Sequence, residues 1–450
     1  MKYFYSILLI FFAYLQIFSQ ENVIYDLQDC INLAKANNIS LKNSELEIGK
    51  MELTKKSAFT NFFPKISAVG TAFRSNDGFI DANMSDIDIS ILSSNVFISD
   101  AIRTLMEVYG DVLDIDINVN TMDRGILGIA YAMQPVFAGG RIVTGNKMAN
   151  LGVEAKRYQH ELSVRDVEVK TEQYFWLVTS LYEKGKTLDI VISLLDTLEK
   201  DATVAYNAGL IMKNDILKVN LKQSEMKQNK IKLDNGIRMA KTALCQHIGI
   251  DYTDSISFVE EKGEIVIPFN DSLTAADVDN RLESKLLGIN LEVEKLKKKM
   301  ILGGTLPQVA LGAGYVFNTL MTKPNSNFMV FGVVSIPISD WWSTSYNLKK
   351  QDLEIETAAN NQKNYHELLK LQMQQNRNEL MESAMQIDVA LEAIKEAEEN
   401  IRLENDYYDA GMATMSDVLQ AQTYLQQSRD SYTDAYIQYR IKLAEYNRNK

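Results

Sequence analysis

The sequence is poor in the residues that interrupt helices. It has six prolines, and none of them falls within residues 136–267 or 338–450, so two long stretches lack the strongest helix breaker. Glycine, the next weakest helix former, is absent from residues 333–410. This composition argues against a series of compact, alternating α/β domains and favours very long helices.

Residues that commonly carry chemistry are also scarce. The two cysteines, Cys30 and Cys245, cannot form a disulfide framework, and the three histidines lie far apart in the chain. The net charge of −12 argues against a nucleic-acid-binding protein, because contact with phosphates needs a basic surface. No carboxylate pair stands beside a nucleophile. We therefore predict no enzyme activity, no cofactor and no metal site.

The N-terminus has the pattern of a targeting segment. Lys2 precedes an apolar run, Tyr3–Phe18, which is shorter than the ~20 residues that a membrane-spanning helix needs. We predict a signal peptide over residues 1–20, with a retained membrane anchor as the alternative. No later apolar run is long enough to span a bilayer as a helix. An exported chain of this kind is either soluble or a membrane β-barrel.

The rest of the chain is an internal duplication. At one constant offset, landmarks of the first half fall on identical residues of the second half: Pro135 on Pro337, Tyr206 on Tyr408, Gly209 on Gly411 and Asp215 on Asp417. A different offset aligns Leu53 with Leu296 and Pro64 with Pro307. The first half therefore carries an inserted segment, at 74–124. Self-similarity of this kind indicates repeated architecture. We predict a first repeat at 21–255, a linker at 256–271 and a second repeat at 272–450.

Both repeats predict the same order of elements. We expect a first helix (27–60 and 272–303), a pair of strands, a long helix (141–206 and 343–408) and a return helix (213–248 and 415–448). The long helices are predicted from apolar residues that recur every seven positions, as in a coiled coil. In the second repeat this seam consists of Met373, Leu380, Ile387, Ile394 and Ile401, with Ala384 and Leu391 between them. A helix of about 65 residues would span roughly 100 Å.

Four short apolar segments indicate strands: Pro64–Phe73, Gly125–Phe137, Pro307–Asn318 and Phe328–Ile338. Each has about the length that a tilted strand needs to cross a bilayer. In the third, large apolar residues alternate with small ones, as expected for a lipid-facing wall around a narrow interior: Val309, Leu311, Tyr315 and Phe317 on one face. A soluble hairpin packed on a helix is the alternative. Aromatic residues that would lie at the membrane interface flank the segments: Phe62, Phe63, Trp341 and Trp342.

Four strands cannot close a membrane barrel by themselves, since the smallest bacterial barrels have eight. An open sheet edge is not tolerated in lipid. If these strands cross a membrane, the chain must therefore assemble with other copies. Three copies would supply twelve strands, but the residues alone leave trimer and dimer open.

This order of elements resembles the TolC family of outer-membrane efflux channels over nearly the whole mature chain. The landmarks are the opening DLQDCINLAKANN (Asp26–Asn38), FFPKIS (Phe62–Ser67), QPVFAGG (Gln134–Gly140) and two turn motifs, YNAGLIMKND (Tyr206–Asp215) and YDAGMATMSD (Tyr408–Asp417). The resemblance implies a homotrimer with mixed α and transmembrane β structure. In it, a twelve-stranded β-barrel in the outer membrane continues into an α-helical barrel in the periplasm.

The resemblance also implies a function. It is that of a passive exit channel in a tripartite efflux pump or type I secretion system, in contact with outer-membrane lipid and with no role in nucleic-acid binding. A periplasmic adaptor would dock on the helical turns and link the channel to an inner-membrane pump of RND or ABC type. The docking residues carried over from the family are Tyr206, Gly209, Asp215, Tyr408, Gly411 and Asp417. A rival interpretation is a periplasmic coiled-coil scaffold or adaptor without membrane strands.

Two positions depart from the family pattern near the second turn. Gln420 stands where some members have a second acid, and Ala413 stands where some have a basic gating residue. Closure of the channel by charged rings is therefore not predicted here. Asp215 and Asp417 have two possible roles, as caps of the return helices, where the helix dipole favours a carboxylate, or also as channel residues.

The inserted segment is expected on the cell exterior, opposite the helices. Within it, Ala101–Tyr109 indicates a short amphipathic helix. An apolar stripe outside the membrane needs burial. We expect three such segments to form a partial lid over the barrel mouth or a surface for another envelope protein.

Overall fold

The computed structural model describes residues 24–74, 76, 124–258, 265, 278–319 and 324–448. The predicted signal peptide, the interior of the insert and the short helix predicted at 101–109 lie outside the described residues. The chain forms two compact units. We call them the helical unit (Met1–Leu53, Asn150–Glu294 and Glu354–Lys450) and the sheet unit (Thr54–Ala149 and Lys295–Leu353). Each unit takes segments from both predicted repeats.

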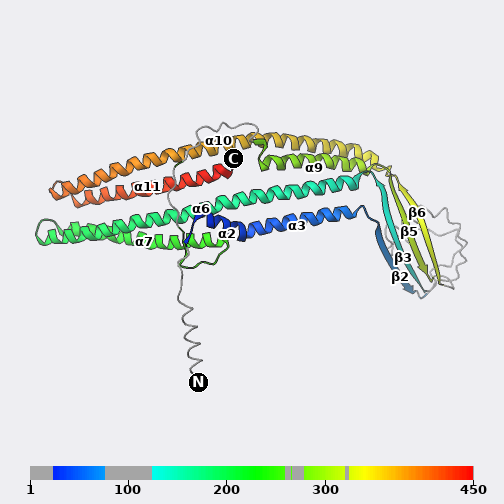
Figure 1. The fold of residues 1–450 in the computed structure, drawn as a ribbon, viewed down its shortest axis with the longest axis horizontal. Coiled ribbons are helices and arrows are strands. Elements are labelled where there is room, and N and C mark those ends of the chain that lie inside the picture. Colours follow the sequence, from blue (N-terminus) through cyan, green and yellow to red (C-terminus); the bar gives the residue numbers. More distant parts are fainter. Residues whose placement is uncertain are drawn as a thin grey trace, which may run out of the picture. The chain divides into compact units, whose positions relative to one another are not determined.

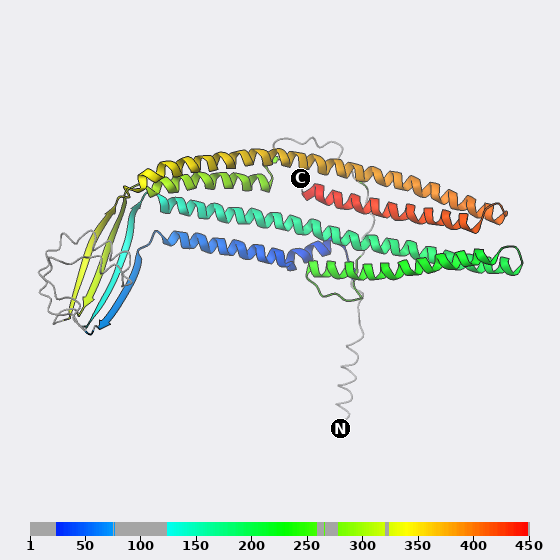
Figure 2. The same ribbon diagram turned by 180° about the vertical axis from the view of Figure 1, so that it is seen from behind.

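The helices confirm the predicted order of elements. They are α2 (Leu27–Asn37), α3 (Ile39–Thr60), α6 (Arg141–Asn207), α7 (Lys213–Ile248), α9 (Leu282–Gly304), α10 (Asp340–Asp409) and α11 (Met415–Arg448). In both views α7 runs back beside α6 and α11 runs back beside α10, so each long helix forms a hairpin with its return helix (Figures 1 and 2). Both return helices have the predicted bounds, and the long helices differ from prediction by at most a few residues.

The first helix of each repeat differs from prediction. The expected single helix at 27–60 is broken at Asn38, whose φ of −58° and ψ of 126° leave the helical region. Its side-chain amide donates to the carbonyl of His247 (2.9 Å), and its side-chain oxygen accepts from the Ser40 N–H (2.9 Å). These bonds replace helical ones, so the break is stabilised by tertiary contact. In the second repeat, α9 begins at Leu282 rather than at 272.

The core of the helical unit lies where the two hairpins and α2 meet. Its largest fully buried side chains are aromatic, and Trp176 packs edge-on against both Phe175 and Tyr436. The guanidinium of Arg440 lies 4.5 Å from the centre of the Trp176 ring. Aromatic burial of this kind dominates core energetics because each ring removes a large apolar area from water.

The predicted heptad seam is only partly buried. Met373, Leu380, Ala384 and Ile387 are buried, but Leu391 is exposed, and Ala390 and Ala397 are buried instead. An α-helix with 3.6 residues per turn drifts relative to a strict seven-residue repeat, so the buried stripe moves to neighbouring positions along a long helix. The inclusion of Leu391 in the buried seam was therefore wrong for the single chain.

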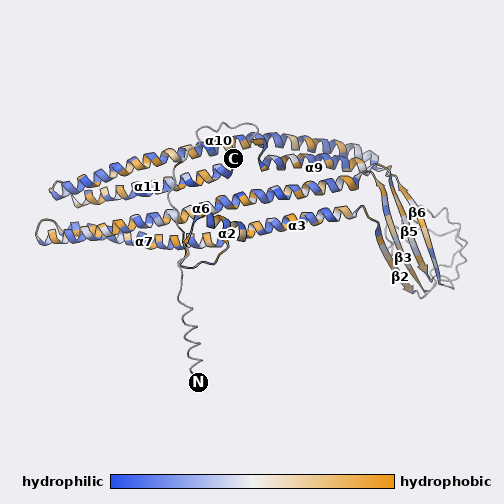
Figure 3. Cartoon of the chain, in the orientation of Figure 1, coloured by the Kyte–Doolittle hydropathy of each residue, from blue (hydrophilic) through white to orange (hydrophobic). Residues whose placement is uncertain are grey.

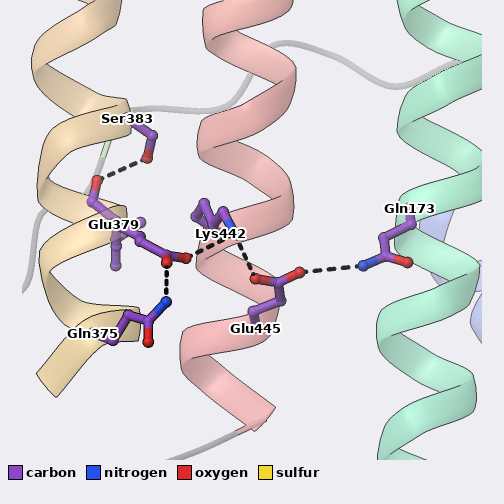
Figure 4. Close-up of polar contacts among 7 residues, drawn as sticks. Gln173, Gln375, Glu379, Ser383, Lys442 and Glu445 are labelled. Atoms are coloured by element: carbon purple, nitrogen blue, oxygen red, sulfur yellow. Dashed lines mark hydrogen bonds and ion pairs between the residues drawn. The ribbon is translucent and has the colours of Figure 1, made fainter. Parts of the chain in front are cut away.

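A polar cluster links three helices beside this core (Figure 4). Lys442 on α11 forms ion pairs with Glu379 on α10 (2.8 Å) and with Glu445 (3.0 Å). The amide of Gln173 on α6 donates to Glu445, and that of Gln375 donates to Glu379. Hydrogen bonds from Lys442 and Gln375 lower the pKa of Glu379. Burial opposes the charge on Lys442, but its bonds to Glu379 and Glu445 outweigh that effect and raise its pKa.

The sheet unit contains a four-stranded antiparallel sheet in the order β2–β3–β5–β6. The strands are β2 (Lys65–Arg74), β3 (Arg124–Ala138), β5 (Gln308–Asn318) and β6 (Asn325–Ser335), close to the four predicted segments. Within the described part of the chain, β2 and β6 pair on one side only, so both edges of the sheet are open. A bulge interrupts β3 between Pro135 and Phe137.

A second, two-stranded sheet was not predicted. Here β1 (Ile24–Tyr25) pairs in parallel with β4 (Ser257–Phe258), inside the segment expected to be a linker. Phe258 is buried and stacks on Tyr25. The pairing fastens the start of the described chain to the end of the first repeat.

The four-stranded sheet has two faces that differ in accessibility, and hydrophobic residues make up much of its strands (Figure 3). We call them the exposed face and the sheltered face. On β2 the exposed and half-buried residues alternate strictly from Ile66 to Arg74. The exposed face includes Ile66, Leu311, Tyr315, Phe317, Phe328 and Val330. The sheltered face includes Val69, Ile129, Tyr131, Met133, Val316, Phe331 and Val333, all half-buried. The exposed set contains most of the residues predicted to face lipid.

The helix ends nearest the sheet approach each other closely at two glycines. A Cβ on Gly139, whose φ is +61°, would lie 1.9 Å from the carbonyl oxygen of Gly303. A Cβ on Gly303 would lie 2.4 Å from the carbonyl oxygen of Gly139. Only glycine fits either position, because backbone atoms occupy the space that a side chain would need.

Candidate functional site

The two turns between long and return helices have the same backbone. In the first turn, Leu210 N–H donates to the Ala205 carbonyl (2.9 Å) and Gly209 N–H donates to Tyr206 (2.9 Å). In the second turn, Met412 and Gly411 make the corresponding bonds to Tyr407 (2.8 Å) and Tyr408 (2.9 Å). Gly209 and Gly411 have φ of +75° and +74°. Both turns are thus Schellman motifs, in which a left-handed glycine satisfies the last carbonyls of the helix.

The aspartates that follow these turns differ in what they contact. The Asp417 carboxylate accepts hydrogen bonds from the Thr414 backbone N–H (2.8 Å) and hydroxyl (2.7 Å), and so caps α11. Met212 stands in the place of Thr414 in the first turn and offers no side-chain cap to α7. Asp215 instead pairs with Lys218 on the same helix, at 3.3 Å. Asp417 therefore has a capping role, and Asp215 lies in the first turn of α7, where the helix dipole favours its carboxylate. An added channel role for either residue stays a prediction.

The two tyrosines also differ, although the sequence predicts equivalent positions. Tyr206 is 41% exposed, whereas Tyr408 is half-buried against a cluster that includes Val219 of α7 and Met415 of α11. The Tyr408 hydroxyl is buried and has no hydrogen-bond partner among the described residues. Burial raises the pKa of Tyr408, and the negative charges of Asp215 and Asp409 raise it further. Tyr408 thus joins the second hairpin to the first and is not a freely exposed docking residue.

Large apolar side chains are exposed at both tips. Leu210 and Met212 in the first turn are 78% and 76% exposed, and Met412 in the second turn is 72% exposed. Ala413 is half-buried and Gln420 is exposed. Lys218 pairs with Asp215 and lowers the pKa of Asp417, in addition to the larger effect of Thr414. The sequence analysis missed Lys218, because it lies on α7 and not in either turn motif.

All four predicted interfacial aromatics lie in the sheet unit, Phe62 and Phe63 between α3 and β2, and Trp341 and Trp342 in the first turn of α10. Phe62 and Phe63 follow α3 and both pack on Phe59, with ring centres 5.5 Å apart. The indole N–H of Trp341 donates to the Thr305 carbonyl (2.9 Å), while Trp342 is largely exposed. Phe59 was missed, although its spacing of three and four residues from the other two rings indicates one helical face.

The described residues contain no group of three or more His, Cys, Asp or Glu side chains that could hold a metal ion. Over the same residues, no helix combines the length and apolarity needed to cross a membrane. The free thiols of Cys30 and Cys245 are both buried, and burial, followed by the nearby charges of Asp29 and Asp26, raises the pKa of Cys30 to about 12.

Comparison with protein families matches residues 304–445 to the outer membrane efflux protein model. This region contains β5, β6, α10 and most of α11. No curated protein shows significant similarity to the chain.

Solved structures match over almost the whole chain. The CmeC outer membrane channel of Campylobacter jejuni has a TM-score of 0.76 at 14% identity, covering 95% of this chain and 85% of that one. The outer membrane protein VceC of Vibrio cholerae has a TM-score of 0.71 at 12% identity, covering 94% and 95%. The MtrE outer membrane channel of Neisseria gonorrhoeae, in its open state, has a TM-score of 0.69 at 12% identity, covering 94% and 88%. At these identities the likeness establishes the fold.

Proposed function

Because the chain carries an outer membrane efflux protein domain on the fold of TolC-like channels, we propose that it is the passive exit duct of a tripartite efflux pump or type I secretion system. The predicted fold class is confirmed by the solved structures, and the family match over residues 304–445 supports the predicted family and its outer-membrane localisation. The family is one of channels rather than enzymes. Adaptor docking, the inner-membrane pump and the secretion role are the proposal.

The observation that carries the proposal is the four-stranded sheet with two open edges. Edge strands expose unpaired N–H and C=O groups, and lipid offers no partner for them. In the proposed assembly, β6 of one copy pairs with β2 of the next until the wall closes. Three copies give a twelve-stranded barrel, which lies within the size range of bacterial outer-membrane barrels.

The helical unit also supports assembly. Several large apolar side chains on α7 and α10 are exposed to solvent in the single chain: Leu217, Leu221, Ile231, Met385 and Val389. Apolar surface of this extent normally marks a contact with another molecule. We propose that neighbouring copies cover it in a closed ring of helices.

The rival interpretation, a periplasmic scaffold without membrane strands, has less support. It leaves the four apolar strands without a role, and the solved structures with the same fold are outer membrane channels. Extraction of membranes distinguishes the two, because a scaffold would wash off in salt, whereas a barrel needs detergent.

The assembly is tested by the mass of the detergent-extracted protein. We expect three chains per particle, measured by native mass spectrometry or by light scattering with correction for detergent. A stable monomer in detergent would contradict the assembly and the barrel with it, because open edges would then have persisted in an apolar medium.

The docking role is proposed for the two turns. Their exposed apolar side chains at Leu210, Met212 and Met412 offer a contact surface that burial on an adaptor would stabilise, at about 25 cal/mol per Å² of apolar area. No energy-converting site is needed in this chain, since the pump would supply the energy.

Docking is tested with the purified cognate adaptor. Gly411→Trp is expected to abolish export and adaptor binding while the protein still inserts as a trimer. Because this change also strains the backbone, Met412→Glu provides a second variant that keeps the turn glycine. Gly49→Trp, at a helical glycine with open space around it, is the matched control. Unchanged adaptor binding in both turn variants would refute the docking assignment.

A further inference from the structure

The sheltered face of the four-stranded sheet carries almost no charge. Lys65, at the start of β2, is its only charged residue; Arg74 and Arg124 pair with each other at the other end, on the exposed face. No acidic residue occurs in any of the four strands. Porin-type barrels, by contrast, have a polar, water-filled interior.

The two faces can be assigned to lipid and to lumen. Apart from Gln134 and Ser326, the uncharged residues of the exposed face are aliphatic, aromatic or glycine, which suits contact with lipid. Ser67 and Thr71 lie on the sheltered face, and along β2 they alternate with Ile66, Ala68, Gly70 and Ala72, which lie on the exposed face. Side chains on the inner side of a curved wall converge and shelter each other, which explains the lower exposure. The sheltered face therefore lines the lumen in the assembly proposed above.

One aromatic residue of the lumenal face lies folded on the sheet. Phe331 of β6 is directly opposite Gly312 of β5, which is in turn opposite Met133 of β3. A Cβ on Gly312 would lie 2.4 to 3.0 Å from three carbons of the Phe331 ring. The ring thus occupies the volume that any other residue at 312 would fill. It lies along the wall instead of projecting from it.

The next cross-strand row repeats this arrangement more loosely. Met329 is opposite Gly314. A Cβ added to Gly314 would lie 3.8 Å from the Cγ of Met329 and 3.5 Å from the Cβ of Tyr131. Two glycines on one strand therefore give space to two large side chains from the neighbouring strand. Glycine weakens a strand interior, so its use here indicates a need for that space.

We propose that Phe331, held flat on Gly312, sets the bore of the barrel and gives its lining an apolar contact for solutes with an apolar body. The inference rests on the proposed channel function and names the class of solute that its lumen suits: neutral or singly charged amphipathic molecules. In a trimer the residue occurs three times around the wall. An aromatic face also attracts an organic cation at close range.

The test uses a cysteine placed beyond this residue. Ser335 lies on the same face of β6, further from the β5–β6 connection that topology places outside the cell. In the Ser335→Cys full-length protein, a bulky, membrane-impermeant maleimide added to whole cells must pass Phe331 to react. The native Cys30 and Cys245 are buried, so they add little background.

Gly312→Ala in this background should lift the ring into the lumen. We expect the labelling rate to fall roughly tenfold, because passage depends steeply on pore diameter. Gly70→Ala is the matched control: it lies in the same sheet, on the exposed face, with no atom near the added Cβ, and it should leave the rate unchanged. Adding Phe331→Ala to Gly312→Ala should restore the rate. That rescue separates a narrowed bore from a misfolded barrel.

The solute class is tested in the same assay. Tetraphenylphosphonium should slow labelling of the Ser335→Cys protein, whereas tetramethylammonium, of equal charge but without aromatic surface, should not. Phe331→Ala should remove the difference. An unchanged rate in Gly312→Ala, or equal effects of the two cations, would overturn the inference while leaving a trimeric channel intact. A monomer in detergent would overturn the proposed function and this inference together.

Discussion

The two turns of the helical hairpins have the same backbone conformation, but their side chains make different contacts. Both end a long helix with a left-handed glycine and the same pair of hydrogen bonds. The first turn leaves its tyrosine exposed and its return helix without a side-chain cap, whereas the second half-buries its tyrosine and caps its helix through Thr414 and Asp417. The backbone geometry of the turn was thus kept in both copies of the duplication. The side chains diverged according to what each turn packs against.

The largest expected difference between the turns concerns the tyrosines. Tyr408→Ala should destabilise the helical unit by about 2 kcal/mol, since it empties a half-buried site beside Val219 and Met415. Tyr206→Ala should change stability by less than about 0.5 kcal/mol, as for other exposed positions. Thermal unfolding of the detergent-solubilised protein, followed by far-ultraviolet circular dichroism, measures both. Equal losses would mean that the two turns are equivalent after all.

The glycines should behave alike where the tyrosines do not. Gly209→Ala and Gly411→Ala should each cost about 1 kcal/mol, because an L-residue is strained at positive φ. Nothing lies within 4 Å of a Cβ at either glycine, so steric contact adds nothing. The same unfolding measurement applies, with Gly49→Ala as a control in a helix. A clear inequality between the two turn variants would show that their backbones are not equivalent in solution.

The caps offer an exchange experiment. Thr414→Ala should destabilise α11 by about 1 kcal/mol through loss of its N-cap, and Met212→Thr should stabilise α7 by up to about 1 kcal/mol, because Asp215 already stands three residues on. Hydrogen exchange of the first-turn amides in each return helix reports the two effects separately. If Met212→Thr leaves exchange at the start of α7 unchanged, a neighbouring group already satisfies those amides.

The smallest expected effect is a dependence on acid pH through Asp417. Hydrogen bonds from Thr414, and the charge of Lys218, lower the pKa of Asp417 below its ordinary value of 3.8. A lowered folded-state pKa contributes stability at pH above 3.8, and this contribution is lost as pH falls through the folded-state value. The melting temperatures of the wild type and Asp417→Asn should therefore differ at neutral pH and converge in strong acid. A constant difference across that range would exclude the carboxylate charge as its source.

Much of the fold could be predicted because strong local signals mark its boundaries. Proline-free stretches define the long helices, and the glycine of each turn sets the start of the return helices at Lys213 and Met415. The strand segments could be predicted from alternation and length. In each case the information is local, so a single sequence carries it.

The parts that could not be predicted depend on contacts between distant segments. The break at Asn38 is stabilised by the carbonyl of His247, and β1 pairs with β4, which lies in the predicted linker after the first repeat. The difference in burial between Tyr206 and Tyr408 arises from the side chains that lie beside each ring. The docking role of the turn residues stays a prediction, and the contacts of Tyr408, Asp417 and Lys218 could be identified only from the packing of the two hairpins.

The contact between Gly139 and Gly303 has a consequence for how this chain can vary. Each glycine occupies the space that a side chain on the other would need, so the two positions form one constraint shared by the two repeats. Once a Cβ at either position has forced the helix ends apart, a second Cβ meets an interface that is already separated. The losses of folding stability caused by substitutions at the two positions should therefore not add, as is usual for residues in direct contact. Neither repeat can change its residue alone without cost, which couples the two copies of the duplication at this one point.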